Sequence, residues 1–317
     1  MKTSVSCGNL TIKVDYFSLE QTLGCGQCFR FDPVDGDPER WRGIANGRVL
    51  EIAQKGNELT FFNVSEAEYE AVWADYFDLN TDYKTIYSAL CADPTLKAAC
   101  DSCGANCCGD THCGGNQCGD THCGGIRILR QDPWEALCSF IISQNNNIPR
   151  IKGIVARLCE HFGDPIDGGF NFPKPETLAA LSCEDLAPVR CGFRDKYILD
   201  AAEKFASGEI DPEKITSLPL EEARKALMTV SGVGPKVADC ALLFGFYNLT
   251  SFPTDVWIKR AMAELFADGL PECARPYAGV AQQVIFHYYR AAMSLSGNRQ
   301  GFPRDNTRSR TYVHFAP

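Results

Sequence analysis

The run VSGVGPKVADC at residues 230–240 places a sharp turn directly in front of a helix. Gly232 and Gly234 suit a tight hairpin, because glycine adopts positive φ values without steric cost. Pro235 favours the first turn of a helix, since its φ angle is already close to the helical value. The pattern therefore predicts a helix with Lys236 at its N-terminus.

Lys236 is a candidate nucleophile. Burial in a pocket and the positive end of a helix dipole both favour the neutral amine, which is the nucleophilic form. Asp255 lies in FPTDVW, before an apolar helical pattern, and is expected to cap that helix as an ionised carboxylate. An isolated lysine at a helix start is more often a surface residue. Together with a carboxylate, however, Lys236 is suited to breaking a glycosidic bond.

Composition and charge are those of a cytoplasmic enzyme. The 317 residues are 45% hydrophobic, which is enough for two domains with sizeable cores. We expect no signal peptide and no membrane span, and hence a protein of the bacterial cytoplasm or nucleoid, or of a eukaryotic nucleus. The 17 cysteines suit a reducing compartment in a chain of this length. The net charge of −9 argues mildly against a nucleic-acid partner, although one local basic face can hold phosphates.

The pattern of the chain predicts an α+β fold, with an N-terminal antiparallel β-sheet domain followed by an all-α domain. Apolar and polar residues alternate in residues 9–64, where Asn46-Gly47 and Gly56-Asn57 are strong hairpin signals. Helical periodicity dominates from Ser65 onwards. The expected divisions are the sheet domain with flanking helices at 1–99, a Cys- and Gly-rich insert at 100–125, the helical domain at 126–296 and a C-terminal tail at 297–317.

The insert repeats GDTHCGG at a period of ten residues. One interpretation is a structural zinc site held by thiolates and imidazoles. The candidate ligands are Cys100, Cys103, Cys113, Cys123, His112 and His122. The alternative is a flexible repeat expansion in a tolerant loop, since the segment holds no apolar residue larger than alanine.

Six separate motifs occur in an order that resembles the helix-hairpin-helix DNA glycosylase/lyases that remove 8-oxoguanine. The motifs are GQCFRF at 26–31, ILRQDPWEALCSFIISQNNNIPRI at 128–151, CGFRDKY at 191–197, SGVGPKVADC at 231–240, FPTDVW at 252–257 and GVAQQVIF at 279–286. The resemblance covers nearly the whole chain outside the insert and the tail. It implies a helix-hairpin-helix glycosylase domain that acts in base excision repair without a required cofactor.

The resemblance also implies roles for individual residues around the damaged base. Lys236 would attack the sugar C1′ of a flipped nucleotide and form a Schiff base, assisted by Asp255. The remaining substrate contacts would be the Gly26 carbonyl at N7 of the base, Cys240 and Phe286 on its two faces, Gln282 on its Watson–Crick edge, and Trp257 beside the phosphate. Trp257 stands where the eukaryotic members have histidine.

The opposite strand would be held by a second set of residues. By the resemblance, Asn145 would fill the gap that the flipped nucleotide leaves, and Phe193 would wedge between bases. Arg150 and Arg194 would bond the cytosine. Further DNA contacts are assigned to Asn146 and to the hairpin residues Gly232 and Gly234. The expected partner is double-stranded DNA containing 8-oxoguanine opposite cytosine. We expect the protein to be a monomer that does not associate with a membrane.

Three other classes of protein fit the sequence less well. Endonuclease III-like enzymes carry a four-cysteine iron–sulfur motif after the helical domain, where this chain has only Cys273. Monofunctional relatives lack the hairpin lysine. A non-catalytic DNA-binding or metal-sensing protein would need neither Lys236 nor Asp255.

Overall fold

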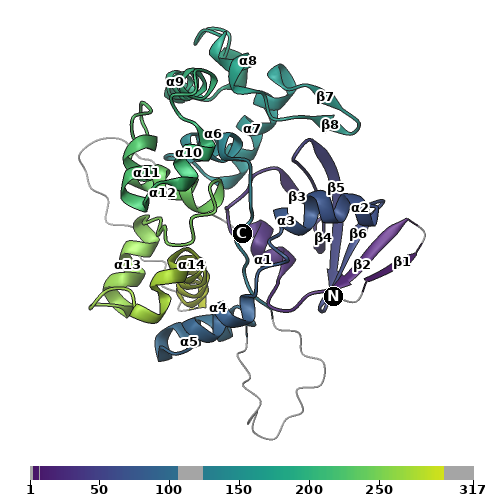
Figure 1. The fold of residues 1–317 in the computed structure, drawn as a ribbon, viewed down its shortest axis with the longest axis vertical. Coiled ribbons are helices and arrows are strands. Elements are labelled where there is room, and N and C mark those ends of the chain that lie inside the picture. The colour runs from purple at the N-terminus through teal and green to yellow at the C-terminus, as the bar shows by residue number, and fades with distance from the viewer. Residues whose placement is uncertain (1–2, 7, 106–123, 296–317) are drawn as a thin grey trace, which may run out of the picture.

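The computed structural model describes residues 3–6, 8–105 and 124–295. Its N-terminal part is a six-stranded antiparallel sheet, shown in purple and blue in Figure 1. The strands run in the order β1-β2-β6-β5-β4-β3. Their bounds are β1 Thr3–Ser6, β2 Asn9–Lys13, β3 Phe31–Val34, β4 Asp37–Ala45, β5 Arg48–Lys55 and β6 Glu58–Phe62.

The expected hairpin at Asn46-Gly47 is confirmed. Ala45 pairs with Arg48 across it, and the two turn residues have φ angles of +49° and +72°. Positive φ at both central positions is the geometry that matches the twist of adjoining strands. The turn fixes the register between β4 and β5, and with it the face on which each apolar residue of these strands lies.

One core lies between the sheet and the helices that follow it. These helices are α1 Leu19–Gly24, α2 Glu66–Glu68, the π-helical turn η1 Tyr69–Trp73 and α3 Ala74–Tyr76. Leu10, Ile52 and Phe61 of the sheet are fully buried in this core. They meet Trp73 and Phe77, whose rings form edge and tilted contacts with their aromatic neighbours.

The rest of the chain is helical apart from a short two-stranded ribbon. Its elements are α4 Tyr83–Leu90, α5 Pro94–Ser102, α6 Pro133–Ser143, α7 Ile148–Phe162, β7 Pro165–Ile166, β8 Gly169–Phe170, α8 Pro175–Ala179, η2 Ala187–Val189, η3 Gly192–Arg194, α9 Asp195–Ala206, α10 Pro212–Ser217, α11 Leu220–Leu227, α12 Pro235–Phe244, α13 Val256–Leu265, η4 Glu272–Tyr277 and α14 Ala278–Leu295. The α+β class is therefore confirmed.

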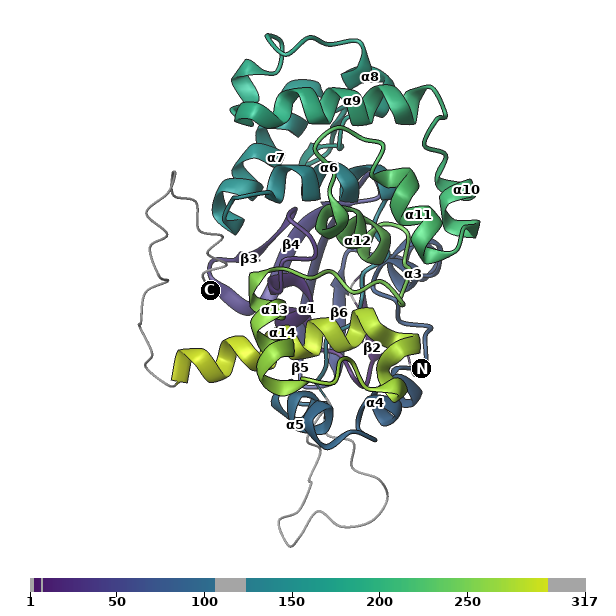
Figure 2. The same cartoon turned by 90° about the vertical axis from the view of Figure 1, so that its left-hand side faces the viewer.

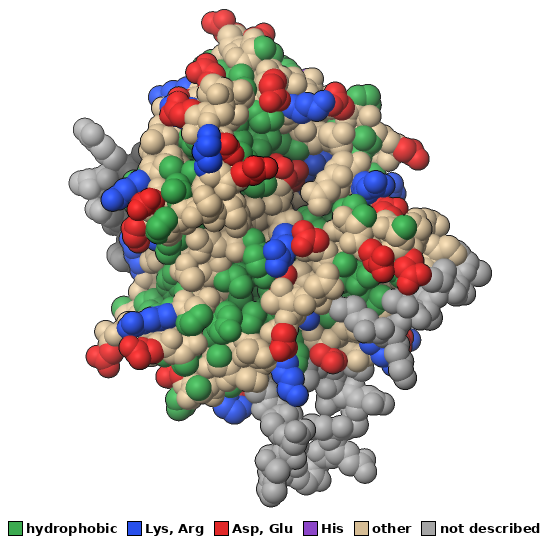
Figure 3. Space-filling model, in the orientation of Figure 1, with side chains coloured by type: hydrophobic (Ala, Val, Ile, Leu, Met, Phe, Trp, Pro, Cys, Tyr) green, Lys and Arg blue, Asp and Glu red, His purple; other side chains and the backbone are tan. Residues whose placement is uncertain are grey.

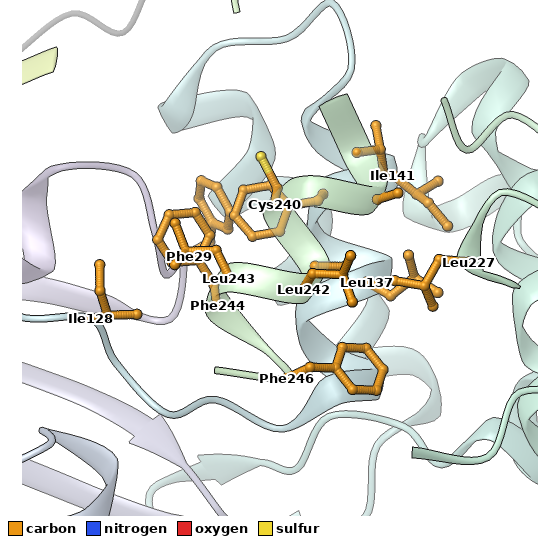
Figure 4. Packing of buried hydrophobic residues seen from close by; sticks show 14 of the residues in the cluster. Phe29, Ile128, Leu137, Ile141, Leu227, Cys240, Leu242, Leu243, Phe244 and Phe246 are labelled. Atoms are coloured by element: carbon orange, nitrogen blue, oxygen red, sulfur yellow. The ribbon is translucent and has the colours of Figure 1, made fainter. Parts of the chain in front are cut away.

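Helices α6 and α12 form the centre of the helical core. Both are apolar around most of their circumference, as expected for helices with neighbours on all sides. Figure 4 shows Leu137 of α6 beside Leu242 of α12. Because α12 is fixed along its length, its first turn, which carries Lys236, is held in a defined position.

Helices α4 and α5 belong to the helical core, although they precede residue 99. Tyr87 and Leu96 are fully buried there, and α5 lies against α14, as Figures 1 and 2 show. Cys100, Cys103 and Ala105 extend this packing into the segment assigned to the insert. The sequence placed these two helices with the sheet because they follow it. In the structure α5 packs against α14, and α4 packs against α5 and η4. The division at residue 99 stays a prediction.

The surface carries both signs of charge. On the face shown in Figure 3, Lys and Arg side chains are interspersed with Asp and Glu. Within the described residues, no helix combines the length and apolar character that crossing a bilayer requires.

Candidate active site

The hairpin before α12 has the geometry that the sequence predicts. Gly232 has φ +75°, and a Cβ at this position would stand 2.5 Å from the ring of Tyr197. Gly234 is the N-cap of α12, and a Cβ there would meet nothing within 4 Å. Gly232 is therefore required by the fold, whereas Gly234 leaves the backbone open to an incoming group. Lys236 lies in the first turn of α12, as predicted.

Asp255 caps the next helix. Its Oδ1 accepts a hydrogen bond of 2.8 Å from the backbone N–H of Ile258, which confirms the predicted N-cap of α13. The bond uses one carboxylate oxygen and fixes the side chain. Asp255 also lines the pocket that contains Lys236.

The loop at residues 25–27 is held against the helical part by Gln27. This side chain is 1% exposed, and its Nε2 donates to the carbonyl of Arg127 at 2.9 Å. Its Oε1 accepts from the backbone N–H of Leu129, also at 2.9 Å. The bonds hold Gly26, whose φ is +87°, at the wall of the same pocket.

The pocket joins residues from five segments of the chain. Its lining consists of Cys25, Gly26, Phe140, Lys236, Cys240, Phe244, Pro253, Asp255, Gln282, Gln283 and Phe286. Six of the seven predicted catalytic and substrate-binding residues are thus brought together. The exception is Trp257, which does not line the pocket and packs edge to face with Tyr289 at a centroid distance of 6.4 Å.

Two thiols lie in the pocket. Burial raises the pKa of Cys25 to about 11, so this thiol is protonated near neutral pH. Burial also raises the pKa of Cys240, while the charge of Lys236 and a hydrogen bond from it act in the opposite direction. The Lys236 Nζ is also 5.6 Å from the ring centroid of Phe140. The amine thus lies between a polarisable sulfur and an aromatic face.

Helix α14 supplies the opposite wall. Phe286 is 6% exposed, and the guanidinium of Arg290 lies 5.3 Å from its ring centroid. Gln282 and Gln283 are each 5% exposed. Burial lowers the pKa of Arg290, while the nearby Asp255 and Cys25 oppose this change. The pocket therefore combines apolar faces with a small number of fixed polar groups.

The predicted contacts to the opposite strand lie around the turn at Asn145. Asn145 is exposed and has φ +48°. The Arg194 guanidinium donates to its carbonyl at 3.4 Å and lies 4.4 Å from the ring centroid of Phe193. Phe193 is 52% exposed, and Arg150 is exposed as well. An open apolar ring, an amide and a cation are therefore available on one surface.

Two of the predicted DNA contacts are buried in the structure. Asn146 is 3% exposed, and its Nδ2 donates to the carbonyl of Ile142 at 3.2 Å. The positive φ of Asn145 turns the chain, so that its neighbour points inwards. Arg194 is 2% exposed, and its guanidinium also donates to the backbone carbonyls of Cys191 and Gln144. These bonds brace the turn, and the DNA contacts of both residues stay predictions.

Four of the six candidate zinc ligands, Cys113, Cys123, His112 and His122, lie outside the described residues. The other two, Cys100 and Cys103, are buried in the helical core. Burial raises the pKa of Cys103 to about 12, which opposes the thiolate that zinc requires. Among the described residues, no group of three or more His, Cys, Asp or Glu side chains is arranged to hold a metal ion.

Five residues that line the pocket were not predicted from the sequence, namely Cys25, Phe140, Phe244, Pro253 and Gln283. Phe140 and Phe244 stack on each other at 5.3 Å and are typical core residues by pattern. Cys25 and Gln283 each adjoin a residue that was identified, and this adjacency is the one signal that the sequence offered.

Comparison with known proteins gives a family match for each of the two parts of the chain. Residues 9–137 match the family model described as 8-oxoguanine DNA glycosylase, N-terminal domain. Residues 138–270 match the model described as HhH-GPD superfamily base excision DNA repair protein. The N-glycosylase/DNA lyase of Saccharomyces cerevisiae is 40% identical over 152 residues, which are 43% of this chain and 40% of the yeast protein. The chain thus spans less than half the length of this relative.

Two solved structures are similar over almost their whole length. The structure of MBOgg1 in complex with a low-affinity DNA ligand is 38% identical, with a TM-score of 0.78, over 92% of this chain and 99% of that chain. The Clostridium acetobutylicum 8-oxoguanine glycosylase/lyase, in complex with double-stranded DNA containing cytosine opposite 8-oxoguanine, is 33% identical, with the same TM-score and the same coverage. This chain belongs to the 8-oxoguanine DNA glycosylase family of the HhH-GPD superfamily.

Proposed function

We propose that this protein is a bifunctional DNA glycosylase/AP lyase that excises 8-oxoguanine from duplex DNA. The observation that carries the proposal is the pocket in which Lys236 and Asp255 lie together with Gly26, Gln282 and Phe286. The pocket combines an amine and a carboxylate with apolar faces for a planar base. The names of the yeast relative and of the Clostridium structure support the same activity.

In the proposed reaction, the Lys236 amine bonds to C1′ of an extruded nucleotide as the bond from C1′ to the base breaks. Extrusion is required because C1′ cannot be reached in a stacked duplex. The base leaves with a proton, and the sugar ring opens to give a Schiff base between Lys236 and C1′. Loss of a proton from C2′ then expels the 3′ phosphate and cleaves the strand. A covalent amine intermediate explains why a lysine is used and not an activated water.

Asp255 is proposed to accept the proton that Lys236 loses and to stabilise positive charge on the sugar. Its carboxylate is fixed by the cap bond to Ile258 and does not need to reorganise during the reaction. Fixed charges of this kind are most effective in a site from which water is excluded.

The base is proposed to be recognised at two edges and on both faces. The carbonyl of Gly26 would accept a hydrogen bond from the N7–H of 8-oxoguanine, whereas N7 of guanine is itself an acceptor and would be repelled. Cys240 and Phe286 would cover the two faces of the base, and Gln282 its Watson–Crick edge. The burial of these three side chains favours a flat, largely apolar occupant.

Preference for cytosine in the opposite strand is assigned to the exposed group around Asn145. Phe193 would enter the gap between bases, and Arg150 would bond the cytosine edge. The Phe193 ring supports this, because it is 52% exposed and therefore accessible to a bound duplex. Arg194 is proposed to act indirectly, by holding Asn145 and Phe193 in place.

The proposed reaction uses no cofactor, and it needs no contribution from the cysteine-rich insert. A non-catalytic DNA-binding protein would have no use for an amine and a carboxylate lining one pocket. The bifunctional enzyme is therefore favoured over that alternative.

The decisive experiment is borohydride trapping on a duplex with one 8-oxoguanine opposite cytosine. Parallel reactions would contain guanine or thymine glycol in place of the lesion. We expect a covalent adduct with the 8-oxoguanine duplex, and none in the Lys236→Gln variant. The matched control is Lys214→Gln, which makes the same change at an exposed lysine on α10 and should trap like the wild type.

Absence of an adduct on every duplex, from folded protein that still binds DNA, would contradict the proposal. An adduct with thymine glycol alone would retain the lyase mechanism and reject the substrate. Duplexes with different bases opposite 8-oxoguanine test the proposed contact with the second strand. In these duplexes Arg150→Ala should reduce the preference for cytosine and leave trapping by Lys236 intact.

A further inference from the structure

Two buried amides lie side by side in the middle of α14. Gln282 and Gln283 are both 5% exposed, and both line the pocket. The helix around them is apolar, since Val280, Val284 and Ile285 are fully buried. Buried amides in such surroundings are unfavourable unless hydrogen bonds compensate for the lost water.

The two amides are bonded to each other. The Nε2 of Gln283 donates to the Oε1 of Gln282 at 2.7 Å. Consecutive helical residues do not normally face one another, so this bond requires both side chains to bend towards a common point. The bond uses the oxygen end of the Gln282 amide, and Nε2 is then the end that is left for an occupant of the pocket.

The Oε1 of Gln283 is buried and has no hydrogen-bond partner among the described residues. Rotating the Gln283 amide by half a turn would place its oxygen against the oxygen of Gln282, and two acceptors would then oppose each other. Rotation of Gln282 alone would oppose two N–H groups in the same way. The orientations of the two amides are therefore coupled, and in the orientation that the structure shows the N–H group of Gln282 is the end left for the pocket.

We propose that Gln283 is a positioning residue that makes the pocket specific for purines carrying a carbonyl at C6, by holding the Gln282 amide with its N–H group towards the base. This deepens the proposed function and rests on it. The assigned role belongs to Gln283, which acts through Gln282 and needs no contact with the base.

The chemistry of the two oxidised purines distinguishes this role from simple packing. 8-Oxoguanine presents a carbonyl oxygen at C6, which accepts a hydrogen bond, whereas 8-oxoadenine presents an amino group there, which donates. A Gln282 amide that is held in place favours the first base and repels the second. An amide that is free to rotate can offer its oxygen to 8-oxoadenine, so the discrimination falls.

The test compares the wild type with Gln283→Met and Gln283→Ala. Methionine keeps the length and approximate volume of glutamine without its donor, and alanine removes the side chain altogether. Single-turnover excision is measured on duplexes with 8-oxoguanine or 8-oxoadenine opposite cytosine. Cleavage of a preformed abasic site is measured on the same samples, because this step needs Lys236 and no base recognition.

We expect both variants to excise 8-oxoguanine about five- to tenfold more slowly, which is the size of effect that follows from losing one neutral hydrogen bond. Excision of 8-oxoadenine should be unchanged or faster, and cleavage of the abasic site should stay within about twofold of the wild type, an effect well below that of one lost bond. The ratio of the two excision rates should thus fall in both variants.

Two results would overturn the inference. One is an unchanged ratio of excision rates in variants that retain abasic-site cleavage. The other is an equal loss of all three activities, since this would make Gln283 a packing residue. If the wild type excises neither base, the proposed function fails as well, whereas wild-type excision with an unchanged ratio in the variants rejects the role of Gln283 alone.

Discussion

Lys236 and Cys240 lie one helical turn apart on α12 and both line the pocket, where burial raises the pKa of the thiol and the charge of the lysine opposes that rise. Residues four apart on a helix lie on one face, so the spacing itself brings the two groups together. The thiol occupies a position where a larger side chain would enter the space available to a base. Size at position 240 is therefore a way to separate base excision from strand cleavage.

Replacing Cys240 by leucine should block base excision and spare cleavage of abasic sites. The added methyl groups would fill the pocket, and overpacking in a buried site typically costs about 1–3 kcal/mol. Cys240→Ala is the matched control, because it enlarges the pocket. Single-turnover kinetics on an 8-oxoguanine duplex and on an abasic duplex measure both steps. Equal losses on the two duplexes in the leucine variant would contradict this expectation.

Replacing Asp255 by asparagine should separate its capping role from its charge. Asparagine caps helices about as well as aspartate, so the free energy of unfolding should change by only about 0.3 kcal/mol. Excision should fall by about 10²-fold or more, as is typical when a group that transfers protons is lost. Asp255→Ala should lose the same activity and about 1 kcal/mol of stability as well. Urea unfolding and single-turnover rates check the two effects, and an active asparagine variant would exclude a role for the charge.

The two hairpin glycines should respond oppositely to alanine. Gly232→Ala places a Cβ against the ring of Tyr197 at a positive φ and should lower the free energy of unfolding by about 2 kcal/mol or more. Gly234→Ala meets open space and should leave stability within about 0.5 kcal/mol. It should nevertheless weaken DNA binding, if a phosphate approaches the backbone there. Thermal unfolding and a binding titration separate the two, and equal stability losses would show that the hairpin has a different geometry in solution.

The protein should lose stability as the pH falls below about 6.5, the usual pKa of histidine, in part because of His287. Burial, and then the charge of Arg290, lower the pKa of His287 in the folded protein. The unfolded chain therefore binds the proton more readily, and the free energy of unfolding decreases as the pH falls from the usual pKa towards the lowered one. His287→Gln should reduce this dependence. Urea unfolding at pH 7.5 and 5.5 compares the two proteins, and identical pH dependences would contradict the assignment.

The helix positions that the sequence predicted for Lys236 and Asp255 depend on local patterns. Lys236 follows a glycine-proline turn, and Asp255 precedes an apolar helical run, so a few neighbouring residues determine each position. Cys25 and Gln283 lacked such a pattern. Their place in the pocket depends on how residues 25–27 approach α14, which only the packed structure determines.

Other differences have the same cause. Asn146 belongs to a run of three asparagines whose exposure cannot be told apart by composition, but the backbone turn at Asn145 directs it inwards. The π-helical turn at Tyr69–Trp73 interrupts a segment whose pattern indicates an ordinary helix. Helices α4 and α5 were assigned by their place in the chain, whereas their packing places α5 against α14 and α4 against α5 and η4.

The bonds from Gln27 to Arg127 and Leu129 have a consequence for the shape of the pocket. The wall at Gly26 comes from the loop at residues 25–27, whereas Lys236 is carried by α12, so the two sides of the pocket are held by separate sets of contacts. A change that loosens the Gln27 bonds would therefore displace the wall at Gly26 and leave the amine of Lys236 on its helix.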